Sequence, residues 1–348
     1  MNYPEKIGGI AELEDVLSQP AERDVAAMAA LDGDVMLLGA GGKMGPSLAR
    51  LVKRASVAAG VNRRVIAVAR FSDQTLLKQF AEHGIESLPA DLLKGDELAQ
   101  LPDVPNIIYM AAKKFGTSSG DPAETASTWA MNAYLPGRVA ERFAKSRIVS
   151  FSTGNVYPFT AAARGGATED TPLDPVGEYG LSALARERIF THFSHQHRTP
   201  MAILRLNYAI DLRYGVLTDL GRKVLAGAPV DVTMGAVNVI WQRDANAACL
   251  GSFAHCATPP EVLNLTGPET LSVRWLATEL SDRLGKEPVF TGEEQPTALL
   301  SNATRCQNRF GYPTVPVAKL LDWVADWLLA GGETWDKPTK FQVRDGKF

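Results

Sequence analysis

The sequence predicts an α/β fold, with a doubly wound parallel sheet and a smaller C-terminal substrate lobe. A glycine-rich segment directly follows a short apolar run near the start of the chain. Strand-like and helix-like segments then alternate as far as about residue 207, which is typical of parallel strands connected by helices. With 348 residues, of which 45% are apolar, the chain is long enough to form two lobes.

The pattern of segments divides the chain into four parts. Residues 1–33 carry two short, polar helical patterns, and we expect them to form an arm on the surface. Residues 34–207 hold the alternating strands and helices of the sheet domain, which later segments also join. Residues 208–330 are expected to form mainly the substrate-binding lobe, and residues 331–348 a polar tail.

Charge and cysteine content argue against several classes of protein. A net charge of −3 and a pI near 6.0 provide no basic surface for nucleic acid. No apolar run approaches the roughly 18 residues of a membrane span, and the N-terminus lacks a secretory signal pattern, so we expect a cytoplasmic protein. The three cysteines are scattered, and His192, His195 and His197 lack a nearby carboxylate pair, so we expect no disulfide and no metal site.

The glycine-rich segment has the spacing of a phosphate-binding loop. It lies between the apolar run Val35–Leu38, which predicts a buried strand, and a helical pattern that begins at Pro46. The first glycine would allow a tight turn, the second would let backbone N–H groups approach a pyrophosphate, and the third would let the helix pack on the strand. A turn without a ligand could carry the same glycines, but the flanking strand and helix favour dinucleotide binding. We therefore expect cofactor contacts from Gly39, Gly42, Lys43, Met44 and Gly45.

The end of the second predicted strand, Arg64–Ala69, bears on the choice of cofactor. Arg70 and Ser72 lie where NAD-binding proteins place an acidic residue on the ribose hydroxyls. An arginine and a hydroxyl there suit the 2′-phosphate of NADP, because a guanidinium can bind phosphate bidentately. The alternative is a solvated arginine at a strand end. These two residues favour NADP as the cofactor, and NAD remains the alternative.

Three further predicted strands bring polar residues to the same edge of the sheet. They are Asn106–Met110, Arg147–Phe151 and Met201–Leu206, and the carboxyl ends of parallel strands share one edge. We expect cofactor contacts from Ala111, Ala112 and Lys113, and substrate contacts from Lys114, Asn155, Asn207, Tyr208 and Arg213. The cations in this set could equally be solvated surface charges.

In their order and spacing, these motifs resemble the extended short-chain dehydrogenase/reductases of the NAD-dependent epimerase/dehydratase family. The resemblance covers roughly residues 34–329. It rests on the three glycines, Asp91-Leu92, Ala111-Ala112, Asn132, the run from Ser152 to Tyr157, the segment from Thr168 to Pro172, Tyr179-Gly180-Leu181-Ser182, and Asp244. It implies a Rossmann domain that binds NAD or NADP and a C-terminal lobe that holds a carbohydrate-like substrate.

The resemblance also implies roles for single residues. Thr153 would be the catalytic hydroxyl, and Tyr179 would be the proton donor or acceptor and would also contact the cofactor. Asn132 would be a third catalytic residue, and Asp91 with Leu92 would contact the cofactor at its adenine. Helices at 125–144 and 179–195 match the pair that commonly forms a four-helix dimer core in this family, so we expect a homodimer.

One departure from the family pattern concerns the catalytic tyrosine. The family has a lysine four residues after it, which holds the nicotinamide ribose and favours the tyrosinate, whereas this sequence has Ala183. An ordinary tyrosine titrates near pH 10 and is a poor base at neutral pH without a nearby cation. Lys113, Lys114, Arg186 or the oxidised nicotinamide could supply that charge.

Two functions follow from these residues. The first is an NAD(P)-dependent oxidoreductase, epimerase or dehydratase acting on a sugar, a sugar acid or a sugar nucleotide. The second is a catalytically silent NAD(P)-binding sensor or scaffold. The loss of the lysine favours the second function, and the presence of Tyr179, Thr153 and Asn132 favours the first.

Overall fold

A seven-stranded sheet forms the centre of the computed structural model, which describes residues 3–72, 74–114, 120–335 and 337–347. Its strands are β1 (Val35–Leu38), β2 (Val65–Ala69), β3 (Glu86–Pro89), β4 (Asn106–Tyr109), β5 (Arg147–Thr153), β7 (Met201–Leu206) and β12 (Glu261–Leu265). They lie in the order β12-β7-β5-β4-β1-β2-β3, and every adjacent pair is parallel. The predicted doubly wound sheet is confirmed. Its order reverses beside β1, where open α/β sheets bind ligands.

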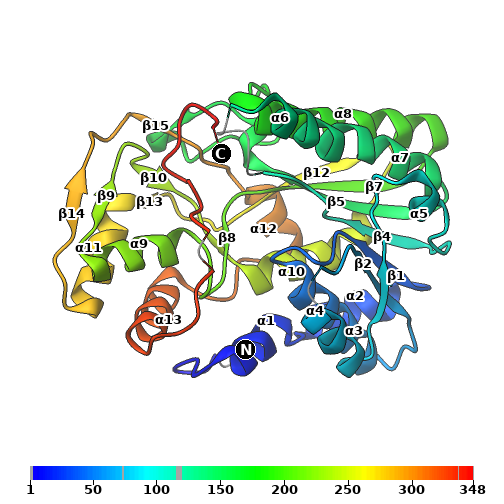
Figure 1. Cartoon of the computed structure of the whole chain (residues 1–348), viewed down its shortest axis with the longest axis horizontal. Helices are drawn as coiled ribbons and strands as arrows, with labels where there is room; N and C mark the ends of the chain where they lie inside the picture. Colours follow the sequence, from blue (N-terminus) through cyan, green and yellow to red (C-terminus); the bar gives the residue numbers. More distant parts are fainter. Residues whose placement is uncertain (1–2, 73, 115–119, 336, 348) are drawn as a thin grey trace.

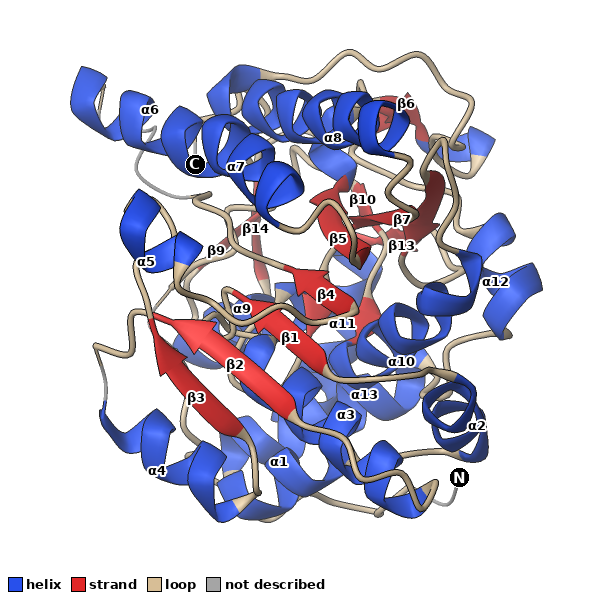
Figure 2. Cartoon of the chain, turned by 90° about the vertical axis from the view of Figure 1, so that its right-hand side faces the viewer, coloured by secondary structure: helices blue, strands red, loops and turns tan. Residues whose placement is uncertain are grey.

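Both faces of the sheet are covered by helices, and the central strand β1 is apolar throughout for that reason. Val35 and Leu37 pack with α3 on one face, whereas Met36 and Leu38 pack with α7 and α8 on the other. Alternate side chains of a strand point to opposite faces, so a strand between two helical layers has no polar side. The layers are visible in Figure 2, with α6, α7 and α8 above the sheet and α3 and α4 below it. The helices on the two faces are α2 (Glu22–Ala30), α3 (Gly45–Ala58), α4 (Gln74–Glu82), α5 (Gly95–Ala99), α6 (Pro122–Trp129), α7 (Leu135–Arg142), α8 (Gly177–His197) and α10 (Gln242–Ser252).

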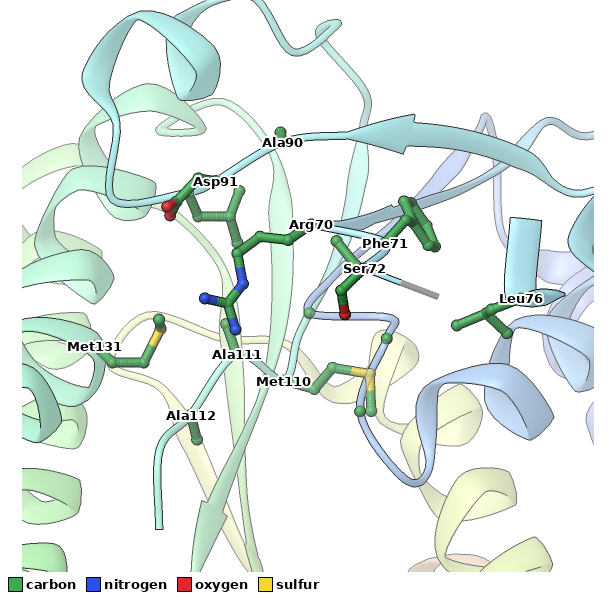
Figure 3. Close-up of a pocket in the computed structure, with 15 residues that line it drawn as sticks. Arg70, Phe71, Ser72, Leu76, Ala90, Asp91, Met110, Ala111, Ala112 and Met131 are labelled. Carbon is green, nitrogen blue, oxygen red and sulfur yellow. The ribbon is translucent and has the colours of Figure 1, made fainter. Parts of the chain in front are cut away.

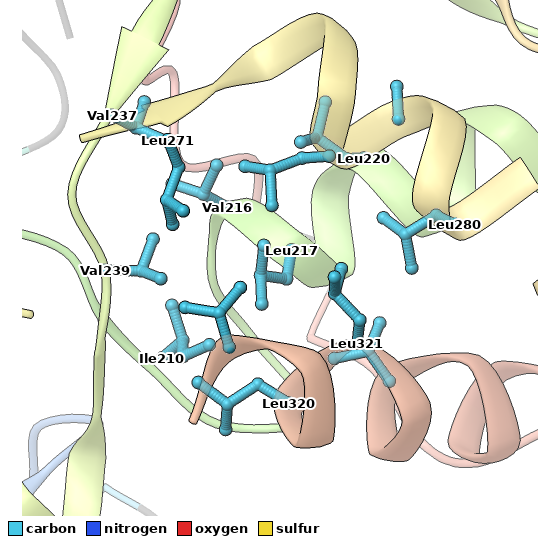
Figure 4. Close-up of a cluster of buried hydrophobic side chains, with 14 of the residues drawn as sticks. Ile210, Val216, Leu217, Leu220, Val237, Val239, Leu271, Leu280, Leu320 and Leu321 are labelled. Carbon is cyan, nitrogen blue, oxygen red and sulfur yellow. The ribbon is translucent and has the colours of Figure 1, made fainter. Parts of the chain in front are cut away.

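The second lobe has its own apolar core. Figure 4 shows Leu217 and Leu220 meeting Leu280 and Leu321 between three helices. The helices of the lobe are α9 (Val216–Ala226), α11 (Val273–Leu284) and α13 (Val317–Leu329). The short strands β8 (Ala209–Ile210), β9 (Pro229–Asp231), β10 (Ala236–Val237), β11 (Ile240–Trp241), β13 (Leu271–Ser272) and β14 (Val289–Thr291) border it, and β15 (Thr297–Ala298) pairs with β6 (Thr160–Ala161). Helix α12 (Thr304–Phe310) packs near β12. None of the helices in the described ranges is long and apolar enough to cross a membrane.

The N-terminal residues are part of the folded body, so the expectation of a surface arm is wrong. Helix α1 (Ile10–Ser18) buries Leu13 and Leu17 completely in the core of the second lobe. Helix α2 buries Met28 in the core below the sheet. The polarity that suggested an arm belongs to the outer faces of these helices, because short amphipathic helices keep only a narrow apolar stripe.

The predicted long helix over residues 125–144 contains a π-helical turn. Helices α6 and α7 are joined by Ala130–Tyr134 in π-helical geometry. Pro136 explains the change, because it has no N–H for the carbonyl of Asn132 four residues earlier. A π turn widens the helix locally and is frequent at functional sites. Here it carries the predicted site residue Asn132.

The loop after β1 has the geometry that its glycines predict. Gly39 has a φ of +94° and donates its N–H to the Val68 carbonyl at 2.9 Å. A Cβ on Gly45 would lie 2.1 Å from the Ala40 carbonyl oxygen, so only glycine lets α3 start this close to β1. At Gly42 a Cβ would meet only the Gly39 carbonyl oxygen, at 3.5 Å. The fold therefore requires glycine at 39 and 45, whereas position 42 has room for a side chain.

We expect Gly42→Asp to fold and to abolish measurable dinucleotide binding, because it adds a negative side chain where a pyrophosphate would approach the loop. Calorimetric titration with NAD and NADP measures the loss. The control is Gly9→Asp, which adds the same side chain at an extended position with no heavy atom within 4 Å. Unchanged affinity in Gly42→Asp would contradict the phosphate-loop assignment.

Candidate active site

A cavity of about 300 Å³ opens at the carboxyl edge of β1, β2 and β4, beside the glycine loop. Figure 3 shows the Arg70 side chain pointing into it, with Ser72 and Asp91 on either side. Its walls include the predicted cofactor residues Gly39, Gly42, Arg70, Ser72, Asp91, Leu92, Ala111 and Ala112. The glycines leave backbone exposed for a phosphate, and the small residues after β4 leave space. The cavity therefore suits the adenosine half of a dinucleotide.

A second cavity, of about 180 Å³, lies at the same edge beyond β5 and β7. Its walls include the predicted residues Met44, Lys114, Thr153, Asn155, Tyr179, Asn207 and Tyr208. Residues that the sequence did not assign to a site also line it, namely Ser152, Leu206, Ala209, Tyr214, Gly215, Val216 and Thr339. The structure thus brings both predicted catalytic hydroxyls and most of the predicted substrate residues into one cavity.

Thr153 and Tyr179 are held at this cavity by local geometry. The Thr153 hydroxyl accepts hydrogen bonds from the backbone N–H and the side-chain amide of Asn155, at 3.2 and 3.0 Å. A Cβ on Gly180 would lie 2.6 Å from the Asn155 carbonyl oxygen, so glycine lets the start of α8 approach this loop. Because the Thr153 oxygen is the acceptor in both hydrogen bonds, the hydroxyl proton can be donated to a substrate oxygen.

Asn132 has a positioning role. It is completely buried, and its amide accepts the N–H of Lys113 at 2.9 Å and donates to the Lys113 carbonyl at 2.8 Å. It also donates to the Ser182 hydroxyl on α8 at 3.0 Å. Asn132 therefore fixes the loop after β4 against α8, and it does not line the second cavity.

The three side-chain cations that could replace the missing lysine have different surroundings in the structure. The Lys113 ammonium pairs with Glu124 at 2.6 Å, and Arg186 donates to the Phe151 carbonyl at 3.0 Å. The Lys114 ammonium lies 5.9 Å from the centre of the Tyr179 ring. Ala183 is fully buried in an apolar cluster with neighbours such as Val156. Lys114 is thus the cation that the structure places at both the second cavity and Tyr179.

Burial shifts the titration of the charged and phenolic groups around this cavity. It lowers the pKa of Lys114 to about 8 and that of Lys43 to about 7, and the second cause for Lys43 is the charge of Lys114. The Lys43 ammonium lies 2.9 Å from the centre of the Tyr214 ring. Burial also raises the pKa of Tyr208 and of Tyr214, so both keep their hydroxyl protons.

Arg213 does not lie in either cavity wall. Its guanidinium pairs with Asp211 at 2.7 Å and with Glu14 of α1 at 2.5 Å, and it is buried. These bonds explain its position as part of the packing between α1 and the second lobe. The structure therefore places Arg213 outside both cavities, and does not support the predicted contact of Arg213 with substrate.

Several residues that line the two cavities were not predicted from the sequence. Thr339 lies in the predicted tail, 160 residues after Tyr179, and no local motif marks it. Met110 and Met131 line the first cavity as apolar residues without a chemical signature. Tyr214 follows the short strand β8 in a loop that has no recognisable motif. Its position over Lys43 depends on how the two lobes meet.

Comparisons with known proteins agree with this arrangement. Among solved structures, the UDP-glucuronic acid 4-epimerase of Bacillus cereus, in complex with UDP-glucuronic acid and NAD, superposes with a TM-score of 0.70 at 17% identity, over 85% of this chain and 99% of that one. The UDP-glucose 4-epimerase of Thermotoga maritima, with UDP-glucose, has a TM-score of 0.68 at 16% identity, over 86% and 99% of the chains.

The sequence comparisons identify the family. No curated protein sequence matches the chain. The profile of the NAD dependent epimerase/dehydratase family matches residues 35–232, which is more than half of the chain and includes the glycine loop, Thr153 and Tyr179. The chain therefore belongs to the NAD-dependent epimerase/dehydratase family.

Proposed function

We propose that this protein is an NAD(P)-dependent enzyme that oxidises, epimerises or dehydrates a sugar, a sugar acid or a sugar nucleotide. The observation that carries the proposal is the common cavity of Thr153 and Tyr179, which adjoins the end of the glycine loop at Met44. Two structural neighbours, one solved with UDP-glucuronic acid and NAD and the other with UDP-glucose, support a carbohydrate substrate. The first cavity supports a dinucleotide as cofactor.

In this proposal Tyr179 acts as the acid/base. As the tyrosinate it takes the proton of a substrate hydroxyl while a hydride leaves the carbon that bears this hydroxyl. As the tyrosine it returns a proton to the same oxygen. Thr153 donates a hydrogen bond to that oxygen and so holds it in line with Tyr179. A bound nicotinamide supplies the acceptor for the hydride. The buried hydroxyls of Tyr208 and Tyr214 remain protonated and can orient other substrate oxygens.

Lys114 takes the electrostatic role of the missing lysine. An ammonium within about 4–6 Å favours an ionised partner, and Lys114 lies at 5.9 Å from the Tyr179 ring centre. It approaches from the loop after β4, whereas the family's lysine approaches from α8. The backbone of this loop is held by Asn132.

The second candidate function is a catalytically silent NAD(P)-binding protein. Ala183 favours this function, because the residue one helical turn after Tyr179 has an uncharged methyl side chain that is buried in an apolar cluster. A silent protein would bind the dinucleotide without needing a proton path. Turnover that depends on Tyr179 separates the two functions.

Homodimerisation remains a proposal, and the exposed apolar residues of the α6–α8 layer support it. Val139 and Phe143 of the predicted dimer helices face the core above the sheet. Trp129, Tyr134 and Leu181 are 37, 56 and 43% exposed, and they provide the second apolar face that an interface needs.

The role of Tyr179 predicts a pH effect. We expect Tyr179→Phe to abolish turnover, and Lys114→Met to lower kcat at pH 7 by about tenfold, because it removes the ammonium near the reacting oxygen. The pKa of Lys114 is lowered to about 8, so its charge is present below that pH and lost above it. The difference between wild type and Lys114→Met should therefore be largest below pH 8.

The measurement is nicotinamide absorbance from pH 5 to 10. Lys286→Met is the control, because it removes an exposed lysine after α11 and should leave the profile unchanged. Full activity in Tyr179→Phe would show that another group transfers the proton.

The position of Arg70 predicts cofactor choice. We expect wild type to bind NADP about tenfold to a hundredfold more tightly than NAD, the range of a charged hydrogen bond, and Arg70→Ala to erase the difference. Arg64→Ala is the control, because Arg64 precedes the opposite end of β2 and pairs with Glu86. Calorimetry with both cofactors measures the ratio, and equal wild-type affinities would remove the role of Arg70.

The exposed face of α6–α8 predicts a dimer. We expect light scattering at micromolar concentration to give twice the mass of the 37.5 kDa chain. Leu181→Glu would place a charge in the apolar face and should shift the mass toward the monomer. Asp96→Glu in the exposed helix α5 is the control. A wild-type monomer would contradict the proposal.

A further inference from the structure

Three buried polar side chains meet at the start of α3, directly behind the glycine loop. Ser47 lies in the first turn of α3, whereas Gln242 and Asn246 lie on α10. Figure 1 shows α10 beside α2 and α3. The two pairs of contacting residues are 195 and 199 positions apart in the sequence. These three side chains form what we call the polar clamp.

The Ser47 hydroxyl is the centre of the polar clamp. It donates to the Met44 carbonyl at 3.1 Å and accepts the side-chain amides of Gln242 at 2.9 Å and of Asn246 at 3.0 Å. A hydroxyl has one donor site and two acceptor sites, so all three are filled. The Asn246 oxygen has no partner among the described residues, so the bond to Ser47 is what satisfies this side chain. Moving Ser47 would leave both buried amides unpaired, which costs free energy.

The polar clamp acts on the last residue of the glycine loop. The Met44 carbonyl accepts the Leu48 N–H at 3.0 Å, as the first turn of a helix requires, and it also accepts the Ser47 hydroxyl. The second bond ties the loop to α10. Gly42 lines the first cavity and Met44 lines the second, so the held segment passes between the two.

Helix α10 is itself held by the wall of the second cavity. Strand β11 ends immediately before α10 and pairs with β8. Tyr208 precedes β8 and lines the second cavity, and its carbonyl accepts the Ile240 N–H of β11 at 3.1 Å. Gln242 follows β11 directly. Hydrogen bonds thus run from the cavity wall at Tyr208 through α10 to the glycine loop at Met44.

The polar clamp is too deeply buried to contact a bound dinucleotide. Ser47, Gln242 and Asn246 are 1, 3 and 0% exposed, and the described walls of the two cavities do not include them. Any effect on cofactor binding must therefore pass through the loop. A phosphate site made of backbone N–H groups binds best when the loop already has its bound shape, because ordering the loop on binding reduces the affinity.

We propose that Ser47, Gln242 and Asn246 are positioning residues for dinucleotide binding, through which α10 holds the glycine loop in the shape that receives the pyrophosphate. This inference rests on the proposed function for the choice of an NAD(P) dinucleotide as ligand. It deepens that function by assigning part of the cofactor affinity to a helix that lies outside both cavities.

The first test compares two buried serines of the same helix. We expect Ser47→Ala to weaken binding of NADP and of NAD by about tenfold, because the loop loses its tie to α10. Ser56→Ala is the control, because Ser56 is also fully buried in α3 and donates to the Val52 carbonyl at 2.8 Å. It should lower the melting temperature and leave both affinities unchanged. Calorimetry with each cofactor measures the affinities.

A second variant separates positioning from stability. Ser47→Ala combined with Gln242→Met and Asn246→Leu replaces every member of the polar clamp by an apolar residue of similar size, so no member is left as an unpaired buried amide. We expect this triple variant to melt at a higher temperature than Ser47→Ala and still to bind about tenfold more weakly than wild type. Gln242→Met alone keeps Ser47 bonded to Asn246, and its affinity decides the matter if the other variants do not fold.

Three results would overturn the inference: wild-type affinity in Ser47→Ala, an equal loss in Ser56→Ala, or a triple variant that regains affinity together with stability. Failure of the proposed function looks different. Dinucleotide binding that depends on Ser47 without nicotinamide turnover of any sugar would support the polar clamp and contradict the enzymatic role of Tyr179. A wild type that binds neither NADP nor NAD would contradict both.

Discussion

A buried ion pair between Glu187 of α8 and Arg205 of β7 fixes the frame on which the candidate site depends. Arg205 donates to both carboxylate oxygens of Glu187, which also accepts the Ser152 hydroxyl of β5. Arg205 further donates to the Tyr157 hydroxyl, which donates to Asn264 of β12. Removing one partner of a buried pair costs about 3–5 kcal/mol, because the other charge is left uncompensated. The network therefore ties α8 to β5 and β7, and Tyr179 at the start of α8 lines the same cavity as Thr153 at the end of β5.

Within this frame, a series of local interactions explains why Lys114 lies near Tyr179, where the family's motif lysine is absent. Pro136 opens a π-helical turn, and the turn presents Asn132 to the loop after β4. Asn132 binds both backbone groups of Lys113, and Lys114 is the next residue. The ammonium near Tyr179 thus comes from a loop that α6–α8 hold in place. Charge at a catalytic group can be supplied from any direction, since Coulomb interactions depend on distance and burial.

The same lysine connects the second cavity to the C-terminal residues 337–347. The Lys114 ammonium lies 5.9 Å from the centre of the Tyr179 ring and donates to the Thr339 carbonyl, so it bridges the start of α8 and the C-terminal segment. The two solved epimerase structures named above superpose on 85% and 86% of this chain and on 99% of their own. This chain therefore carries segments beyond the shared fold. Its ends are built into the core, through Leu17 near the start and Phe341 near the end.

The sequence by itself predicted the sheet, the glycine loop and the order of the site residues, because each strand, turn and helix leaves a local pattern of apolar residues and glycines. The apolar run Val35–Leu38 and the glycine spacing are local signals, and Thr153 and Tyr179 follow strand and helix boundaries that periodicity marks. Only the tertiary structure decided which cation lies near Tyr179, that Arg213 pairs with Glu14 199 residues away, and that Thr339 lines the same cavity as Thr153. The physical reason is that burial and charge pairing between distant segments leave no period in the sequence, since each side supplies only half of the contact.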